Sequence, residues 1–496
     1  MGMITVTLLL PVLGALLLAT VRSLTVKQIQ TVAYGATIAT FAASLVLLAQ
    51  FDRTNPALQL GEAYAWIPAL NAEIAFAVDG ISLVLILLTT FLTPLVLVAS
   101  TSTITDRFRG YAAAFLLLEA AVIGVFAATD VLLFAVLFEF TIVPMYLIIG
   151  IWGGTNRRYA AVKFFLYTLA GGLAMLVAIV YLYTKAGSFA YADMLQLELT
   201  LTEQRWLFFA FLAAFAVKIP IWPVHTWLPD AHTEAPTGGS VFLAGVLLKM
   251  GSFGVLRYML PLFADAARLY APWLIGFAVV GILYGAIVAL MQADVKKLVA
   301  YSSVSHMGFV VLGTFALNTT ATAASVVQMV NHGLSTGALF LLIGFLYERR
   351  HTREIAAFGG LGASVPVLAG FWLVVSLSSL ALPGLNGFVG EFPILLGTYA
   401  RYPAAAILAA FGAVLAAVYL LWAYQRIFHG PLTSDENRDT PDMTKREIGI
   451  LAPLVALIIA IGIYPSPLFD LVEPSVERVL IETGVGETMT LGGGAR

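Results

Sequence analysis

The feature that most constrains the fold is a series of uninterrupted apolar runs, each about as long as a bilayer is thick. A helix needs about 20 consecutive apolar residues to cross the hydrocarbon core, and several runs in this chain reach that length. Apolar residues make up 60% of the chain and charged residues only 11%, which is typical of a membrane protein and not of a water-soluble one. The sequence therefore predicts an all-α polytopic membrane protein with one continuous helical domain.

Charged or Gly/Pro-rich breaks divide the chain into about 14 predicted transmembrane helices. They lie near residues 3–21, 29–50, 81–100, 111–128, 131–151, 160–184, 205–225, 239–262, 271–292, 298–317, 322–347, 365–400, 402–428 and 447–465. The first run lacks a basic leader and a small-residue cleavage site, so we expect it to be retained. The twelfth is too long for one straight helix and contains Pro383, Gly384, Gly387 and Gly390, which predicts a broken helix.

The positions of lysine and arginine predict the orientation in the membrane, because basic residues in short loops stay on the cytoplasmic side. One set of alternating loops is rich in them: Arg22, Lys27, Arg107, Arg109, Arg157, Arg158, Lys296, Lys297, Arg349, Arg350, Arg353, Arg426, Lys445 and Arg446. The opposite loops hold only Arg53, Lys185, Arg205, Arg268 and a few others. This bias places the first set in the cytoplasm and both termini outside, as an even number of spans requires.

Several kinds of chemistry are not supported by the sequence. The chain contains no cysteine, which excludes disulfides, iron–sulfur clusters and thiolate metal sites. A net charge of -2 gives no indication of nucleic-acid binding. There is no Gly-rich phosphate loop, metal-ligand spacing or serine nucleophile motif, and the loops are too short for a catalytic domain. We therefore expect no cofactor and no metal in this chain, and chemistry only within the membrane or on a partner.

The segment 214–239, AFAVKIPIWPVHTWLPDAHTEAPTGG, combines a charge with a helix break inside the seventh predicted span. Lys218 lies in an apolar run and is followed by Pro220 and Pro223. Proline frees backbone groups that then need water, a neighbouring helix or a ligand. Because broken helices at membrane depth are tolerated where they line a cavity, the segment predicts a working site.

Ionisable side chains near the centre of a span cost about 2.5 kcal/mol or more to insert, so each calls for a partner or a water-filled cavity. Six of them are candidates for proton transfer: Glu139 in the fifth span, Lys218 in the seventh, Lys249 in the eighth, His306 in the tenth, His332 in the eleventh and Glu391 just past the second break. Hydroxyl side chains lie near both histidines, and such groups suit a hydrated proton wire.

Five of the six candidates also have a structural interpretation. Glu139 and Lys218 are predicted to pair, either as a static ion pair or as a switch, because a nearby carboxylate favours the charged lysine that burial disfavours. Lys249 could instead lie on the lipid-facing side of its helix and extend its ammonium group to the membrane surface. Either histidine could serve only in packing.

Three further ionisable residues are secondary candidates. Glu119 is either a second partner or a packing hydrogen bond, while His225 and His232 either line a proton uptake path or cap a helix. Asp230 and Glu234 are not expected to be catalytic; we expect them at the membrane surface, where they could cap the next helix. After Pro465 the chain carries charged residues among apolar ones, which is compatible with a short amphipathic surface helix. The alternative is a solvated end of the chain, at residues 492–496.

Six stretches together resemble the antiporter-like, proton-pumping subunits of respiratory complex I, the NADH:quinone oxidoreductase. They are FAVDGISL at 76–83, LFEFTIVPMYLIIGIWGG at 137–154, KIPIWPVHTWLPDAHTEAPTGGSVFLAGVLLKMG at 218–251, DVKKLVAYSSVSHMGF at 294–309, NHGLSTGALF at 331–340 and LPGLNGFVGEF at 382–392. The similarity covers about residues 75–465. The carboxylate Glu391 is typical of the M-type (chain-four type) branch, whereas N- and L-type relatives carry lysine there.

The resemblance implies 14 helices with two inverted five-helix repeats, each holding one broken helix at the seventh or the twelfth span. The chain would then divide into helices 1–3 (residues 1–110), the first repeat (111–262), the second repeat (271–428), and helix 14 with the tail (429–496). It implies a non-redox subunit of a translocase in the bacterial inner membrane, with L- and N-type subunits and lipid as partners. NADH, FMN, iron–sulfur clusters and quinone would belong to partner subunits.

The implied mechanism is proton movement from the cytoplasm to the outside, driven by electron transfer in partners. Lys249 would be loaded first, Lys218 would be held charged by Glu139, and His306 and His332 would relay the proton toward Glu391. Three alternatives stay open. They are a subunit of a multisubunit Na⁺/H⁺ antiporter, a subunit of a related hydrogenase or photosynthetic complex, and a purely structural scaffold.

Overall fold

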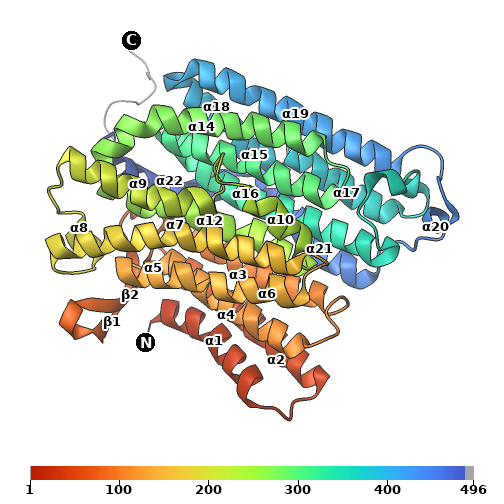
Figure 1. Ribbon diagram of the computed structural model, residues 1–496, viewed down its shortest axis with the longest axis horizontal. Coiled ribbons are helices and arrows are strands. Elements are labelled where there is room, and N and C mark those ends of the chain that lie inside the picture. The colour runs from red at the N-terminus through yellow and green to blue at the C-terminus, as the bar shows by residue number, and fades with distance from the viewer. Residues whose placement is uncertain (1, 486–496) are drawn as a thin grey trace.

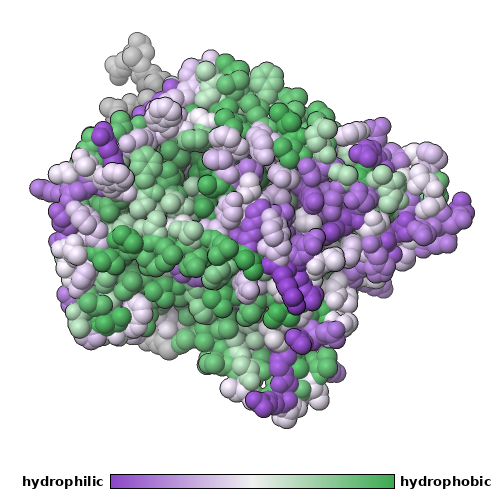
Figure 2. Space-filling model, viewed as in Figure 1, coloured by the Kyte–Doolittle hydropathy of each residue, from purple (hydrophilic) through white to green (hydrophobic). Residues whose placement is uncertain are grey.

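The computed structural model describes residues 2–485 as a bundle of long, roughly parallel helices. Figure 1 shows α1 and α2 along one side of the bundle and α19 along the opposite side. On the face shown in Figure 2, hydrophobic side chains cover the middle, and hydrophilic ones gather at the end that carries α20. A belt of this kind is what a protein surrounded by lipid requires.

Within residues 2–485, twelve helices are long and apolar enough to cross a membrane. They are α1 (Met3–Thr20), α2 (Val26–Gln50), α3 (Gly80–Ser100), α4 (Phe108–Ala127), α5 with α6 (Val131–Phe140 and Ile142–Trp152), α7 (Arg157–Ala186), the composite helix Thr237–Leu262, α14 (Ala264–Leu290), α15 (Val295–Phe315), α16 (Thr319–Arg350), α19 (Pro403–Phe428) and α21 (Lys445–Ile463). Each matches one predicted span. The exact count of about 14 spans and the two inverted repeats remain predictions.

The seventh and twelfth predicted spans are both interrupted, as the prolines and glycines indicated. The seventh, 205–225, covers most of α9 (Leu201–Lys218) and the irregular segment after it, and α10 (Trp227–Glu234) begins just beyond its predicted end. The twelfth consists of α17 (Pro366–Ser379) and α18 (Asn386–Arg401). Pro220 and Pro223 both follow cis peptide bonds in the first break. The predicted breaks are therefore present, and each separates two helices.

The expectation of an all-α protein needs one correction, because residues 51–80 contain a β-hairpin and not only loop. Strand β1 (Gln59–Ile67) pairs antiparallel with β2 (Ala72–Val78), with Tyr64 opposite Ile74. Side chains that point alternately to two faces give no long apolar run, so a search for apolar runs alone cannot detect these strands. Glu62 on β1 accepts a hydrogen bond from the Ile4 backbone nitrogen, which fixes the hairpin to the start of α1.

Helix boundaries follow local capping signals at the ends of the bundle. Capping boxes, in which the cap and the third helical residue bond reciprocally, begin α2 at Thr25, α3 at Asp79, α9 at Thr200 and α21 at Thr444. The short helices α8 (Tyr191–Met194), α20 (Asp435–Arg438) and the 3₁₀ turns at Pro68–Leu70, Ile355–Ala357 and Leu361–Ala363 belong to the connecting segments.

The last described helix, α22 (Ser466–Glu482), buries one apolar side against α3 and α16. This agrees with an amphipathic helix after Pro465, while residues 492–496 lie outside the described part of the chain. Gly80 permits the close approach of α22, since a Cβ there would lie 1.7 Å from the Leu471 carbonyl oxygen.

Burial separates the central helices from those that face lipid. The composite helix Thr237–Leu262 and α16 are fully buried in their apolar windows, and α15 is 94% buried, whereas α1, α2 and α19 are only 33% buried. The composite helix contains α11 (Thr237–Phe242), α12 (Leu248–Gly254), α13 (Leu260–Leu262) and two π-helical segments, Leu243–Leu247 and Val255–Met259. Lys249, His306 and His332 therefore lie on the three helices that the rest of the bundle encloses.

Candidate functional site

Two contact pairs of ionisable side chains form the centre of the candidate site. The Lys249 Nζ lies 2.7 Å from Nδ1 of His332, joining α12 to α16. Nδ1 of His306 on α15 lies 2.6 Å from Oε1 of Glu391 on α18. All four side chains are at most 4% exposed, so each relies on protein groups for its hydrogen bonds. The structure thus brings together four of the six predicted residues.

Local backbone geometry places Lys249. The lysine lies between the two π-helical segments, and its Nζ also donates a hydrogen bond to the Ala244 carbonyl oxygen within the first segment. A π-helical turn shifts the hydrogen-bond register of the backbone and is often found at functional sites. The buried ammonium therefore has one backbone acceptor and one imidazole partner.

Glu391 is held by groups from two helices, one of which is itself held by a third. Besides His306, the Gln328 side-chain nitrogen on α16 donates to Glu391 Oε1 at 2.9 Å, while Oε2 has no partner. The second ring nitrogen of His306 lies 3.2 Å from the Tyr419 hydroxyl on α19. This carboxylate follows the second helix break by one turn and a half, so the break positions it among α15, α16 and α19.

Lys218 and Glu139 lie on neighbouring helices without forming the predicted direct pair. Lys218, at the end of α9, donates to Oγ1 of Thr141 at 3.2 Å and faces the Phe138 ring at 5.0 Å. Both carboxylate oxygens of Glu139 lack a hydrogen-bond partner, and among residues 2–485 no ion pair within 4 Å joins the two side chains. Gly172 on α7 leaves the space for Glu139, because a Cβ there would lie 1.6 Å from Oε1.

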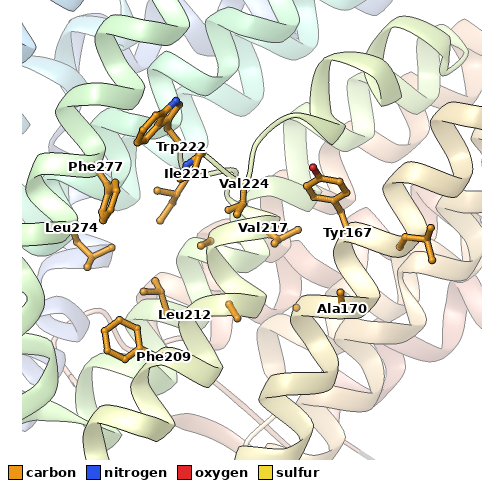
Figure 3. Close-up of a pocket in the computed structure, with 15 residues that line it drawn as sticks. Tyr167, Ala170, Phe209, Leu212, Val217, Ile221, Trp222, Val224, Leu274 and Phe277 are labelled. Carbon is orange, nitrogen blue, oxygen red and sulfur yellow. The ribbon is translucent and has the colours of Figure 1, made fainter.

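The aromatic residues around the first break fix its path. The indole nitrogen of Trp227 donates to the Val217 carbonyl oxygen at 2.9 Å, which ties α10 back to the end of α9. Figure 3 shows an apolar pocket beside this break, lined from α7, α9 and α14. Its volume is about 620 Å³, and Trp222 and Tyr167 are among its lining residues. Because the lining contains no charged side chain, this pocket is not suited to handling protons.

The secondary candidates occupy distinct places. The His232 ring stacks on Phe340 at 4.8 Å with both nitrogens unpartnered, and His225 packs edge-on against Tyr284. Phe340 lines a cavity of about 260 Å³ that also contacts Lys296. His232 therefore stands beside a cavity at the basic end of the bundle.

The three remaining carboxylates differ in their contacts. Glu119, fully buried on α4, has no hydrogen-bond partner on either oxygen. Asp230 forms an ion pair with Lys163 at 2.7 Å. The Glu234 carboxylate accepts a hydrogen bond from the Asn156 backbone nitrogen at 2.8 Å, so it supports the start of the earlier helix α7. It does not cap the next helix, α11, whose start has no side-chain cap, so that prediction is wrong for Glu234.

Sequence reasoning missed two sets of buried polar groups. One set consists of neutral side chains around the second break: Gln328, Asn331, Ser378, Asn386 and Tyr419. Buried amides inside predicted spans could have indicated it.

The other set is the network of Asp79, which contacts Arg257 at 2.7 Å and Arg478 at 3.0 Å. Burial raises the pKa of Asp79, but the two arginines and Ser82 outweigh it and hold the pKa below its usual value. Arg257, a charge within the eighth predicted span, was the available signal. Across residues 2–485 no group of three or more His, Asp or Glu side chains is placed to hold a metal ion.

Comparisons with known proteins agree on one family. A family model described as NADH:quinone oxidoreductase/Mrp antiporter, TM, matches residues 128–416, and one described as NADH-ubiquinone oxidoreductase chain 4, amino terminus, matches residues 3–126. The chain is 48% identical over 467 residues to NADH-quinone oxidoreductase subunit M of Rhodobacter capsulatus, covering 92% of this chain and 91% of the relative. It is 40% identical over 474 residues to NADH-ubiquinone oxidoreductase chain 4 of Arabidopsis thaliana, covering 95% and 96%.

Solved structures share the fold. A chain of respiratory complex I from Thermus thermophilus with bound NADH has a TM-score of 0.88 at 32% identity, covering 97% of this chain and all of that one. A chain of the Mrp complex from a Dietzia species has a TM-score of 0.86 at 19% identity, covering 97% and 99%. The second likeness concerns the fold alone.

Proposed function

The chain belongs to the NADH:quinone oxidoreductase/Mrp antiporter transmembrane family, and on this premise we propose that it is the M-type, proton-translocating membrane subunit of an NADH:quinone oxidoreductase. Relatives that align along nine-tenths of their length carry the subunit M name. The enzyme's electron transfer takes place in partner subunits, and this chain is the non-redox part that moves protons. Its partners are the other membrane-arm subunits, in the inner membrane of a bacterium.

The observation that carries the proposal is a line of buried ionisable groups: Lys249 contacts His332, His306 contacts Glu391, and the two histidine rings lie 6.0 Å apart between centroids. Lysine, histidine and glutamate can each hold or release a proton, and groups in contact titrate as a coupled set. Buried groups of this kind within spans are costly and mark ion or proton pathways. A static packing role does not require four such groups in succession.

Protons enter this line from the cytoplasm, which is the side that the basic loops occupy, and both termini lie outside. The cavity beside Phe340, Lys296 and His232 supports this direction, because it lies at the basic end. His232 then passes the proton toward Lys249. Glu391 releases it to the outside, and each step biases the next through repulsion of like charges and attraction of opposite ones.

Lys218 and Glu139 act as the gate of the first broken helix. Their separation supports a switch more than a static ion pair, because neither charge is neutralised by direct contact. When the two approach, the carboxylate stabilises the charged lysine; when they separate, the lysine releases its proton. Residues 111–262 and 271–428 form the two inverted repeats, so that each repeat supplies one broken helix to the line.

The test uses the whole complex in sealed vesicles, with NADH oxidation and proton uptake measured together. Glu391→Gln removes the charge and keeps the size, so proton uptake per NADH should fall. Glu139→Gln and Lys218→Ala should lower it as well. Glu203→Gln is the matched control, since this carboxylate lies at the exposed start of α9 with Lys185 as its partner. Unchanged proton uptake in all three site variants would refute the proposal.

A second candidate is exchange of Na⁺ for protons, because the matching family model includes Mrp antiporters. The two functions differ in their energy source. Na⁺-dependent proton movement in vesicles without NADH would favour the antiporter, whereas proton uptake that requires NADH and not Na⁺ favours the proposed function.

A further inference from the structure

An apolar groove lies where early and late helices of the chain come together. Its volume is about 390 Å³, and it is lined by α2, α3, α16, α21 and α22. Val330 and Leu334 of the buried helix α16 form its floor, while Leu45 of α2 and Leu457 of α21, which are 44% and 38% exposed, form its rims. The groove is therefore open to the surroundings of the protein, which are lipid for an apolar surface within the spans.

The groove extends over about one half of the membrane. Phe41 of α2 and Phe91 of α3, whose ring centroids lie 5.9 Å apart, mark its deep end, and Phe91 is close to the middle of α3. The other end reaches Arg53, in the loop after α2, on the side of the membrane that the basic loops predict to be the outside. A cavity that runs from the surface to the middle of a bilayer has the length of one lipid leaflet.

Arg53 is the one charged side chain among the described residues that line the groove. It is exposed, and within residues 2–485 its guanidinium has no ion pair and no hydrogen-bond partner. The neighbouring Asp52 carboxylate instead accepts hydrogen bonds from the backbone nitrogen and the hydroxyl of Thr54. The guanidinium is thus free to bind an anion at the mouth of the groove.

An apolar groove with a free arginine at its surface end matches the two parts of a phospholipid. The apolar lining suits an acyl chain, and a guanidinium forms paired hydrogen bonds with a phosphate group. No carboxylate lines the groove to bind a headgroup amine, so a headgroup with net negative charge fits better than a zwitterionic one. The apolar pocket beside the first break lacks such a charged side chain in its lining.

We propose that this groove binds one anionic phospholipid, whose phosphate contacts Arg53 and one of whose acyl chains lies over α3 between α2 and α21. Lipid binding here is separate from the proton transfer of the proposed function. Protein buries only 33% of the apolar window of α2 and 28% of that of α21, whereas α16 is fully buried. The acyl chain fills the space between these two peripheral helices and completes the packing around α16.

The test uses the whole complex in nanodiscs that contain a phosphatidylglycerol with a photoactivatable diazirine in one acyl chain. A phosphatidylcholine with the same chain serves for comparison, and peptide mass spectrometry locates the cross-links. The phosphatidylglycerol should label the groove about fivefold more than the phosphatidylcholine, which is the factor expected for one arginine near an anionic headgroup. Arg53→Gln should remove this preference. Leu45→Trp fills the groove and should lower labelling by both lipids.

Two further variants are matched controls. Arg205→Gln removes an exposed arginine of α9 that does not line the groove. Val46→Trp adds the same bulk at the next residue of α2, which is 40% exposed and also outside the lining. Both variants should be labelled in the groove as the wild type is.

A cryo-electron microscopy map of the wild-type complex in the same nanodiscs should show an elongated density in the groove that ends beside Arg53. An empty groove, or a helix of a neighbouring subunit in it, would overturn the proposal. Equal labelling by the two lipids, or an unchanged preference in Arg53→Gln, would overturn it as well. If a variant does not assemble, the map and the comparison of the two lipids in the wild type decide. Failure of the lipid site leaves the proposed function standing, because that function is tested by proton uptake in Glu391→Gln.

Discussion

Replacing Lys249 by methionine separates the role of the charge in transport from its role in stability. Methionine has similar length and no charge, so it removes the contacts of Nζ with His332 and the Ala244 carbonyl oxygen. Leaving the imidazole without that partner costs about 1–3 kcal/mol. Removing an ammonium from the centre of a span returns about 2.5 kcal/mol or more. The two effects are opposite in sign and similar in size, so the free energy of unfolding should change by less than about 2 kcal/mol.

The assay compares wild type, Lys249→Met and Lys27→Met as an exposed control in the purified complex. Thermal denaturation should show nearly equal stability for all three, while proton uptake per NADH falls only in Lys249→Met. Full proton uptake in Lys249→Met would refute the role of Lys249 in the line. A destabilisation above about 4 kcal/mol would refute the balance of energies, because it would mean that the lost contacts outweigh the relieved charge.

Four further predictions follow from particular contacts. Asp79→Asn leaves the buried Arg257 and the partly exposed Arg478 without their shared carboxylate, so it should lower stability by about 3–5 kcal/mol in thermal denaturation. The pKa of Asp79 is lowered in the folded protein. Its contribution to the free energy of unfolding is therefore fully present above the unfolded pKa of about 3.9 and is lost as the pH falls through the lower folded pKa. Hydrogen exchange of α22, compared between neutral and acidic pH, would detect this loss. Gly172→Ala should displace the Glu139 carboxylate and lower proton uptake as Glu139→Gln does, whereas Gly150→Ala, whose Cβ would have only an ordinary contact at 3.6 Å, should not. Lys163→Met breaks a partly exposed ion pair and should cost less than about 1 kcal/mol, with no effect on proton uptake.

The spans could be predicted from the sequence because crossing a bilayer depends on properties that are local in the chain. Length and hydropathy alone located the twelve long helices, and proline and glycine located both breaks. The β-hairpin at Gln59–Val78 was not predicted, because strand side chains that point alternately to two faces give no apolar run. Asp79 belongs to the stretch FAVDGISL that carries the family resemblance, but its arginine partners come from segments far along the chain.

The candidate site was predictable in its members and not in its connections. Hydropathy identifies Lys249, His306, His332 and Glu391 as costly inside a membrane, because it measures transfer from water for each residue alone. The members of the two contact pairs, however, are 83 and 85 residues apart in the chain. Which side chains touch depends on how each helix is rotated and which helices are neighbours.

Sequence by itself determined that this chain spans a membrane, where its two broken helices lie, and which buried charges need partners. Only the tertiary structure decided that Lys249 meets His332, that His306 meets Glu391, and that Lys218 stands apart from Glu139. It also decided that the neutral amides of Gln328 and Asn331 surround the gap between the two pairs. The reason is that the cost of burying a charge is set along one helix, whereas the groups that offset this cost come from other helices and are selected by packing.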